Sequence, residues 1–183
     1  LWATILRPNI DTAIDATCGN GHDSLVLARL LFPETPEVSL SRLICIDIQE
    51  RACQNTQQAL RKDYADLLDS GRIQVLHQSH APLPMDGVLQ ADDQDKEFLS
   101  VALVVYNLGW LPNNAETTTK EDCITQMETT LQSMVDAMLL LRIGGMLSVV
   151  TYPKTNAQED LAVRTFLECA ALLSSNIQTW QDF

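Results

Sequence analysis

The stretch IDTAIDATCGNGHDS, which covers residues 10–24, is the part of the sequence that decides the fold. Its apolar first half predicts a buried strand over Thr12–Ala16. Asp15 stands at the end of this strand, and Gly19 and Gly21 follow in the turn before a helix. Glycines at such a turn adopt positive φ and let backbone N–H groups approach a ligand. The stretch therefore predicts a pocket for a nucleotide-like cofactor.

Strand and helix patterns alternate along the rest of the chain. Apolar patterns predict further strands over Leu43–Ile48, Ile73–His77, Val101–Tyr106 and Met146–Tyr152, and a sixth strand would open at Ile177–Phe183. Apolar periodicity and end signals predict helices over Ser24–Leu31, Glu50–Asp69, Glu121–Leu141 and about Asn156–Leu173. This alternation predicts an α/β fold, with a mostly parallel central sheet and helices on both faces. Residues 1–183 are expected to form a single domain, because no linker or internal repeat interrupts the pattern.

The clearest apolar stripe belongs to the helix expected over Glu121–Leu141. It steps by three and four residues through Ile124, Met127, Leu131, Met134, Met138 and Leu141. Thr118 with Glu121 resembles a capping box at its start, and Gly144-Gly145 would end it. The prolines and acidic residues of Ala81–Phe98 predict a surface loop.

The composition favours a globular chain without a membrane span. Apolar residues make up 46% and charged residues 20% of the 183 positions, and no apolar run approaches the roughly 20 residues of a membrane helix. The formal net charge of −12 argues against tight, nonspecific binding to nucleic acid, which usually needs a basic face. The charge still allows an RNA substrate that is held by a local patch and released quickly.

The five cysteines form no metal-binding pattern. None belongs to a Cys-x-x-Cys pair, and no histidine lies at ligand spacing from two of them, so no metal is expected. Cys45 in a core strand and Cys169 on an apolar helix face are expected to be buried free thiols, which suits an intracellular reducing compartment. Because the chain begins at Leu1, a targeting segment upstream would not be seen. The cytoplasm, a chloroplast and a mitochondrion therefore remain open.

Polar residues at further strand ends narrow the choice of cofactor. A dinucleotide site would have a third glycine where this chain has Ser24, which weakens the dehydrogenase interpretation. Asp47, which ends the second strand, is placed to accept hydrogen bonds from both hydroxyls of a ribose. These features favour S-adenosylmethionine, and a tight strand-to-helix turn without a ligand is the alternative. The residues expected to bind the cofactor are Asp15, Thr17, Gly19, Asn20, Gly21, His22, Asp23, Asp47, Ile48, Gln49, Ser79, His80 and Asn107.

For four of these residues the sequence indicates either an alternative role or the part of the cofactor that they would contact. His22 and Asp23 lie at the start of the first helix, where they either contact the methionine part of the cofactor or cap the helix. Ser79 and His80 follow the third strand, where residues that contact adenine usually fall.

A second motif, Asn107-Leu108-Gly109-Trp110, follows the apolar run Val101–Tyr106. Ligands of open parallel sheets bind at such strand ends. The motif is similar to the Asn-Pro-Pro-Tyr signature of amino-methyltransferases, which implies that these four residues take part in catalysis. By that similarity, the side-chain oxygen of Asn107 and the next backbone carbonyl would accept hydrogen bonds from the target amine. Trp110 would stack on a planar base; a strand-end turn with a core tryptophan is the alternative.

Together these segments resemble one family, long labelled putative rRNA methylase, whose characterised members are MnmM-type tRNA methyltransferases. The matching segments are DATCGNGHDS at Asp15–Ser24, CIDIQ at Cys45–Gln49, the region of His80, NLGWLP at Asn107–Pro112 and GGMLSVVTYP at Gly144–Pro153. There are departures: Lys154-Thr155 stands where the family commonly has Gly-His, and Asn113-Asn114 where it often has Gly-Gly. The chain also stops at Phe183, where a family member would add a final strand.

The resemblance implies a Rossmann-like class I methyltransferase, whose sheet would lack that last strand if the chain is complete. It implies methyl transfer from S-adenosylmethionine to the exocyclic amine of an aminomethyl(thio)uridine in the tRNA anticodon loop. A methyltransferase for rRNA or a small amine, and a nucleotide-binding scaffold without catalysis, are the alternatives. Because the chain is acidic, a homodimer is one way to assemble a surface that docks tRNA.

Overall fold

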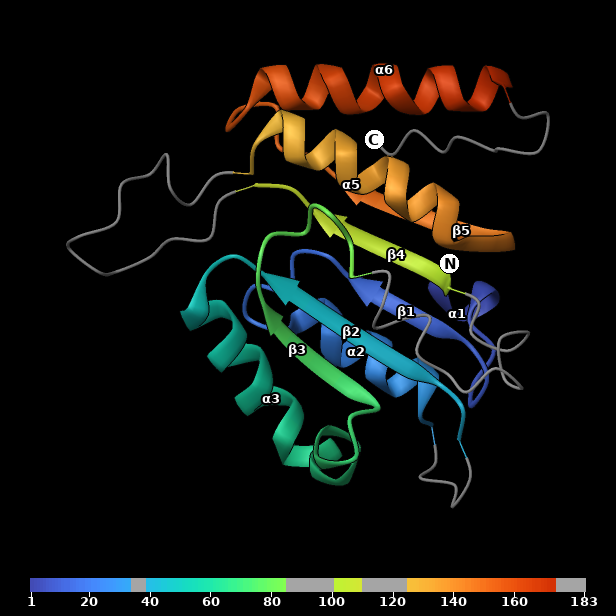
Figure 1. Ribbon diagram of the computed structural model, residues 1–183, viewed down its shortest axis with the longest axis vertical. Coiled ribbons are helices and arrows are strands. Elements are labelled where there is room, and N and C mark those ends of the chain that lie inside the picture. Colours follow the sequence, from blue (N-terminus) through green and yellow to red (C-terminus); the bar gives the residue numbers. More distant parts are fainter. Residues whose placement is uncertain (34–38, 85–100, 110–124, 174–183) are drawn as a thin grey trace.

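In the part of the chain that the structure describes, five parallel strands form one sheet in the order β3-β2-β1-β4-β5 (Figure 1). The computed structural model describes residues 1–33, 39–84, 101–109 and 125–173. Its strands are β1 Thr12–Asp15, β2 Arg42–Asp47, β3 Ile73–His77, β4 Val101–Asn107 and β5 Leu141–Val150. Its helices are α1 Trp2–Ile5, α2 His22–Leu31, α3 Glu50–Asp69, α5 Met127–Leu140 and α6 Ala157–Leu173. The predicted α/β fold with a parallel sheet is confirmed.

Helices cover both faces of the sheet, because successive residues of the central strands point to opposite sides. Ala13 of β1 packs with α2 and α3 in one core, whereas its neighbour Ile14 packs with α5 and α6 in the other. In β4, Leu103 and Val105 face the first core, and Val104 faces the second. Figure 1 shows the two layers, with α5 and α6 on one side of the strands and α2 and α3 on the other.

The strand order reverses between β1 and β4. The chain steps outward from β1 to β2 and β3, then returns to place β4 beside β1. At such a switch point the connections leave in opposite directions, and a crevice opens outside the carboxyl ends of the strands. The glycine loop after β1 and the Asn107 motif after β4 lie on the two sides of this point, as their places in the sequence predict.

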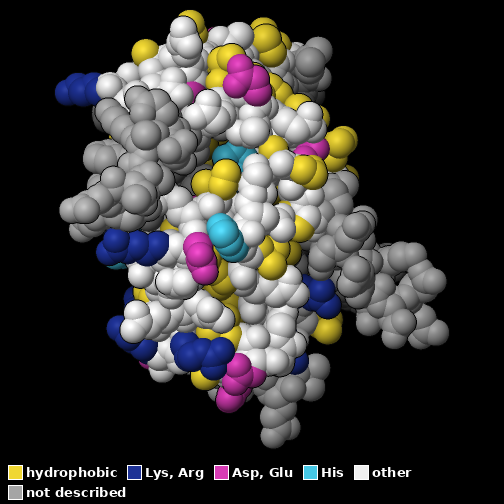
Figure 2. All heavy atoms as spheres, turned by 60° about the vertical axis from the view of Figure 1, so that its left-hand side comes forward, with side chains coloured by type: hydrophobic (Ala, Val, Ile, Leu, Met, Phe, Trp, Pro, Cys, Tyr) yellow, Lys and Arg dark blue, Asp and Glu magenta, His cyan; other side chains and the backbone are white. Residues whose placement is uncertain are grey.

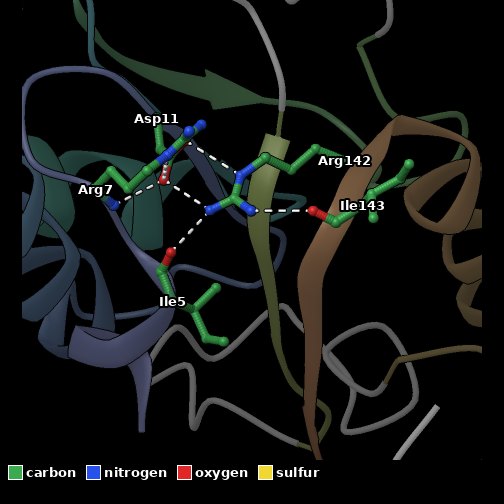
Figure 3. Close-up of polar contacts among 5 residues, drawn as sticks. All are labelled: Ile5, Arg7, Asp11, Arg142 and Ile143. Atoms are coloured by element: carbon green, nitrogen blue, oxygen red, sulfur yellow. Dashed lines mark hydrogen bonds and ion pairs between the residues drawn. The ribbon is translucent and has the colours of Figure 1, made fainter. Parts of the chain in front are cut away.

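The amino end of the sheet is held by a buried ion cluster (Figure 3). Asp11, which precedes β1 and is fully buried, lies 2.6 Å from Nη2 of Arg7 and 3.0 Å from Nη2 of Arg142. Arg142 also donates to the carbonyls of Ile5 and Ile143. Burial alone would raise the pKa of Asp11, but hydrogen bonds from both guanidinium groups outweigh it and hold that pKa below its ordinary value. The cluster therefore joins α1, β1 and β5 at the end of the sheet opposite the crevice.

The helix predicted over Glu121–Leu141 begins later and ends earlier. Residues 121–124 lie outside the described part of the chain, and Gln126 has extended backbone with φ −103° and ψ 131°. At the other end, Leu141 is also extended and pairs with Val101 as the first residue of β5. Tertiary contacts at both ends thus shorten a helix whose apolar pattern runs on.

The prediction that Gly144-Gly145 stop this helix is wrong, because both glycines lie inside β5. Gly144 has a φ of 75°, and a Cβ on Gly145 would lie 3.1 Å from the carbonyl oxygen of Ala102. Pairing jumps from Val101–Leu141 to Leu103–Met146, so β5 carries extra residues here. The glycines form a bulge in the strand, which is their usual role in a sheet interior. The strand predicted over Met146–Tyr152 is therefore both longer and earlier.

Two predictions of burial are also wrong. Cys169 is exposed on α6, although Cys45 is fully buried as expected. Met138 is 39% exposed, because α5 turns a narrower face of small residues to the sheet, where Ser133 shares a 2.6 Å hydrogen bond with the hydroxyl of Tyr106. The predicted cap of Thr118 with Glu121, most of the loop over Ala81–Phe98 and the strand over Ile177–Phe183 lie outside the described residues.

Candidate active site

The loop between β1 and α2 has a shape that only glycine permits at two positions. Gly19 and Gly21 have φ values of 51° and 82°. A Cβ on Gly21 would lie 3.0 Å from Cα of Thr56, because α3 packs directly against the loop. The hydroxyl of Thr56 donates to the carbonyl of Gly19 at 3.0 Å. The loop is thus held from behind by α3, and its other side faces the crevice.

Asp15 lies beneath this loop. Its fully buried carboxylate accepts hydrogen bonds from Oγ of Ser24 at 2.6 Å and from the backbone N–H of Thr17 at 3.4 Å. Burial raises the pKa of Asp15 to about 7. The side chain therefore ties the end of β1 to the start of α2, and it does not line the cavity that the loop borders.

Asp47, at the end of β2, joins the loop to the second half of the site. One carboxylate oxygen accepts from the N–H of Gly19 at 2.9 Å, and the other accepts from the N–H of Gln49 at 2.8 Å. Burial raises the pKa of Asp47, and these backbone donors oppose the shift. A carboxylate offers about four acceptor sites, so each oxygen can still accept a hydroxyl hydrogen from a ligand.

The Asn107 motif is fixed by its backbone. The N–H of Asn107 donates to Oγ1 of Thr17 at 2.7 Å, which joins the end of β4 to the glycine loop. The N–H of Leu108 donates to the carbonyl of Val150 at 2.8 Å, and the Leu108 side chain is buried. The backbone is therefore rigid, whereas the amide side chain of Asn107 makes no hydrogen bond to another described residue.

A cavity of about 520 Å³ lies between these elements, at the carboxyl edge of the sheet. This is the usual size of a pocket for a small molecule or cofactor. Residues that the sequence analysis selected and that line the cavity are Thr17, Gly19, Asn20, His22, Asp23, Asp47, Ile48, Gln49, Ser79, His80, Asn107 and Gly109. Asp15, Gly21 and Leu108 are not on its wall, and Trp110 lies outside the described residues.

Five further residues line the opposite wall, namely Thr125, Gln126, Thr129, Tyr152 and Thr155. Tyr152 ends the strand predicted over Met146–Tyr152, which puts it near the expected substrate mouth; the other four were not predicted. Thr125 and Gln126 were expected inside a helix, yet they precede α5 and face the crevice. The polar start of an otherwise apolar helix was the available signal, because helices that follow strands of a parallel sheet begin at its carboxyl edge.

His80 gives the cavity a polar group without a partner. Its Nε2 is buried and makes no hydrogen bond to the described residues. The ring meets the ring of Tyr106 edge to face, with centroids 6.1 Å apart. Burial lowers the pKa of His80, which favours the neutral imidazole. An uncharged ring nitrogen in a pocket that also holds a buried carboxylate fits a nucleoside-containing cofactor.

Two further findings concern what else the described residues hold. They contain no group of three or more His, Cys, Asp or Glu side chains that is arranged to bind a metal ion. Within the same ranges, no helix combines the length and the apolar character needed to cross a membrane.

The fold and the place of the cavity are those of the class I methyltransferases, the class whose cofactor is S-adenosylmethionine. The parallel sheet, the glycine loop after β1, the carboxylate that ends β2 and the cavity at the switch point all belong to it. The profile of the family described as "Putative rRNA methylase" matches residues 43–181. The chain belongs to this family.

Solved structures of related proteins agree with this assignment. A putative rRNA methylase from Clostridium thermocellum is 32% identical, with a TM-score of 0.66; the match covers 91% of this chain and 76% of that one. A putative methyltransferase from Streptococcus mutans, in complex with SAH, is 27% identical, with a TM-score of 0.63 and the same coverage.

One curated relative has a named substrate. The chloroplastic tRNA (mnm(5)s(2)U34)-methyltransferase of Arabidopsis thaliana is 26% identical over 152 residues, which are 83% of this chain. The chain spans about half the length of that relative.

Proposed function

We propose that this protein transfers a methyl group from S-adenosylmethionine to the exocyclic amine of an aminomethyl(thio)uridine at the wobble position of tRNA. The observation that carries the proposal is the convergence of Gly19, Asp47 and Asn107 on one cavity. A cofactor side and an acceptor side thus share a single pocket. The similarity to the chloroplastic tRNA methyltransferase supports the choice of acceptor, and it supports an organelle among the compartments left open.

The residues of the cofactor side bind and orient. The carboxylate of Asp47 would accept the ribose hydroxyls, and the N–H groups of the loop around Gly19 approach the ligand closely because no side chain intervenes. His22 and Asp23, at the start of α2, lie on the wall where the methionine part would fit. S-adenosylmethionine, when bound, supplies a methyl group on a positively charged sulfur. Because this carbon is already activated, alignment of the acceptor can provide much of the rate enhancement.

Asn107 would align the acceptor. Its side-chain oxygen would accept an N–H of the amine and so direct the nitrogen lone pair toward the cofactor side. The amine attacks only when neutral, and a partly dry wall disfavours the ammonium form. Gly109, Thr125 and Tyr152, which line the cavity together with Asn107, are uncharged. We therefore assign the departing proton to water.

Among the described residues, the surface around the cavity offers RNA few cations. Figure 2 turns the carboxyl edge of the sheet forward and shows mostly uncharged surface at its centre, with lysine and arginine side chains toward the margins. With a net charge of −12, long-range attraction of RNA is weak. We propose that tRNA docks through contacts near the cavity, or on a homodimer in which the margins of both subunits, with their lysine and arginine side chains, contact one tRNA.

The test is mass spectrometry of nucleosides from tRNA that lacks only this methyl group. After incubation with the protein and S-adenosylmethionine, the aminomethyl nucleoside is expected to gain one methyl, and Asn107→Ala is the control for contaminating activity. Because the family is described as rRNA methylase, ribosomal RNA is treated in parallel. Methyl transfer to rRNA with none to tRNA would replace the proposed acceptor.

A further inference from the structure

We propose that Tyr152 forms the second wall of the acceptor side, on which the planar base that carries the amine stacks, and that the buried Glu159 holds Tyr152 in place. This inference rests on the proposed function. It assigns a binding residue and a positioning residue on the side of the cavity opposite the glycine loop.

Tyr152 lies directly against the Asn107 motif. It follows β5, lines the cavity and keeps 46% of its surface exposed. A Cβ on Gly109 would lie 2.8 Å from Cδ2 and 3.2 Å from Cε2 of the ring, so the ring packs on the bare backbone of Gly109. An accessible aromatic ring that packs on Gly109, two residues after the amide proposed to orient the amine, is placed to stack on a nucleobase.

A turn fixes the backbone of Tyr152. Its carbonyl accepts hydrogen bonds from the N–H groups of Thr155 at 2.8 Å and Asn156 at 3.1 Å. The side-chain oxygen of Asn156 then accepts the N–H of Glu159 at 3.2 Å, which caps α6. The position of the ring is therefore tied to the first turn of α6.

The carboxylate of Glu159 ties this turn to the start of α5. It is only 2% exposed and accepts hydrogen bonds from the hydroxyls of Thr125 at 2.7 Å and Thr130 at 2.6 Å. The N–H of Thr125 reaches the carbonyl of Gly109 at 3.4 Å, and its carbonyl accepts from Asn156 at 3.3 Å. A continuous network of hydrogen bonds thus connects Gly109, through Glu159, to the turn that holds Tyr152, and the ring of Tyr152 packs in turn on Gly109.

The presence of a glutamate, Glu159, in this hydrogen-bond network indicates a role beyond packing. Glu159 has no cationic partner among the described residues. Burial of a carboxylate that accepts its hydrogen bonds from two hydroxyl groups costs folding free energy, which an apolar residue at this position would avoid. The carboxylate of Glu159 orders Thr125, Thr130 and the turn after Tyr152. We therefore infer that its role is to fix the position of the Tyr152 wall.

The test compares Tyr152→Phe, Tyr152→Leu, Glu159→Gln and the double variant Glu159→Gln/Tyr152→Leu, with Glu168→Gln as an exposed control on the same helix. KM and kcat are measured with tRNA that lacks the methyl group, and cofactor binding is measured by calorimetry. Tyr152→Phe keeps the ring and should keep the parent's KM for tRNA. Tyr152→Leu should raise that KM by roughly tenfold or more, with unchanged cofactor binding. Glu159→Gln should raise KM less, and the double variant should be no worse than Tyr152→Leu.

The outcomes separate this inference from the proposed function. A parent protein that methylates tRNA, with Tyr152→Leu at the parent's KM, overturns the stacking wall alone. Effects of Glu159→Gln and Tyr152→Leu that multiply in the double variant show that Glu159 does not act through Tyr152. A parent protein that methylates no RNA overturns the proposed function, and this inference falls with it. If Glu159→Gln does not fold, Glu159→Asp replaces it, because it keeps the charge and shortens the reach.

Discussion

Asp47 uses one carboxylate for two tasks. Both of its oxygens already hold backbone N–H groups, those of Gly19 and Gln49, and both retain acceptor capacity for a ribose. Loss of the side chain would therefore loosen the glycine loop and remove the cofactor contact together.

We expect Asp47→Ala to weaken binding of S-adenosylmethionine at least tenfold. Charge-assisted hydrogen bonds contribute about 1.5–3 kcal/mol each, and both cofactor contacts are lost. Asp47→Asn keeps one acceptor oxygen and should lie between this variant and the parent. Calorimetric titration gives the dissociation constants, and an Asp47→Ala value equal to the parent's would rule out the ribose contact.

Asn107 should separate catalysis from cofactor binding. Its backbone N–H holds Thr17 whatever the side chain is, so Asn107→Ala leaves the cofactor side intact. We expect kcat/KM for methyl transfer to fall by about 100-fold or more, because the amine is no longer aligned. Single-turnover kinetics at saturating cofactor measures this loss. Turnover equal to the parent's would remove Asn107 from the mechanism.

At the scale of the elements, the ion cluster at Asp11 joins three segments that are distant in sequence. Asp11→Ala leaves Arg142 partly buried and without its carboxylate. We expect the free energy of unfolding to fall by about 3 kcal/mol, as when one partner of a buried pair is removed. Urea unfolding measures the change, and Arg7→Ala, which removes a half-exposed partner, should cost less.

The same variant tests whether the two ends of the sheet are independent. The cluster lies before β1, whereas the cavity lies after it. Folded Asp11→Ala should therefore bind the cofactor as the parent does. A large loss of cofactor affinity at a temperature where the variant is folded would show that the ion cluster also shapes the site.

Elements differed in how well the sequence predicted them. Glu50–Asp69 and Ile73–His77 have the predicted bounds, because their apolar patterns end where Gly71 and polar residues begin. The start of α5 was missed, because Thr125 is drawn out of the helix by Glu159, which lies 34 residues away. Gly144-Gly145 read locally as a helix stop, and only pairing with β4 shows that they form a bulge.

The residues of the cavity also divide into those that the local sequence pattern predicts and those that depend on tertiary packing. Gly19, Asp47 and Asn107 were predictable because strand ends of a parallel sheet meet at one edge. The places of Thr125 and Thr129 were not, since they depend on how α5 and α6 pack together. The local pattern therefore predicts the cavity residues that follow β1, β2 and β4, and tertiary packing adds those at the start of α5.

At the scale of the whole molecule, we expect the contribution of Asp15 to stability to fall as pH rises from about 4 to 7. The folded-state pKa of Asp15 is about 7, whereas the unfolded carboxyl titrates near its ordinary value of 3.8. In this window the native state keeps a proton that the unfolded state has released. The free energy of unfolding thus decreases by up to about 1.4 kcal/mol per pH unit from this group.

Comparison of the parent with Asp15→Asn isolates this effect. Asparagine keeps an oxygen that accepts from Ser24 but does not titrate. Urea unfolding at pH 5 and pH 7.5 should show a smaller pH dependence in the variant. The raised pKa of Asp47 acts in the same direction and the lowered pKa of His80 in the opposite one, and both are present in the parent and in the variant. Identical slopes would mean that Asp15 is already ionised in the native state at pH 5.

The bulge at Gly144 has a consequence for how this protein can vary. Between Val101 and Leu103, β4 advances two residues while β5 advances five, and from there to Asn107 the two strands pair without interruption. The extra residues of β5 are thus accommodated at the end of the strand that lies far from Asn107. Insertions and deletions near Gly144 should accumulate among natural relatives without shifting Val150 against Asn107, whereas a single added residue at Val149 would misalign the chemistry.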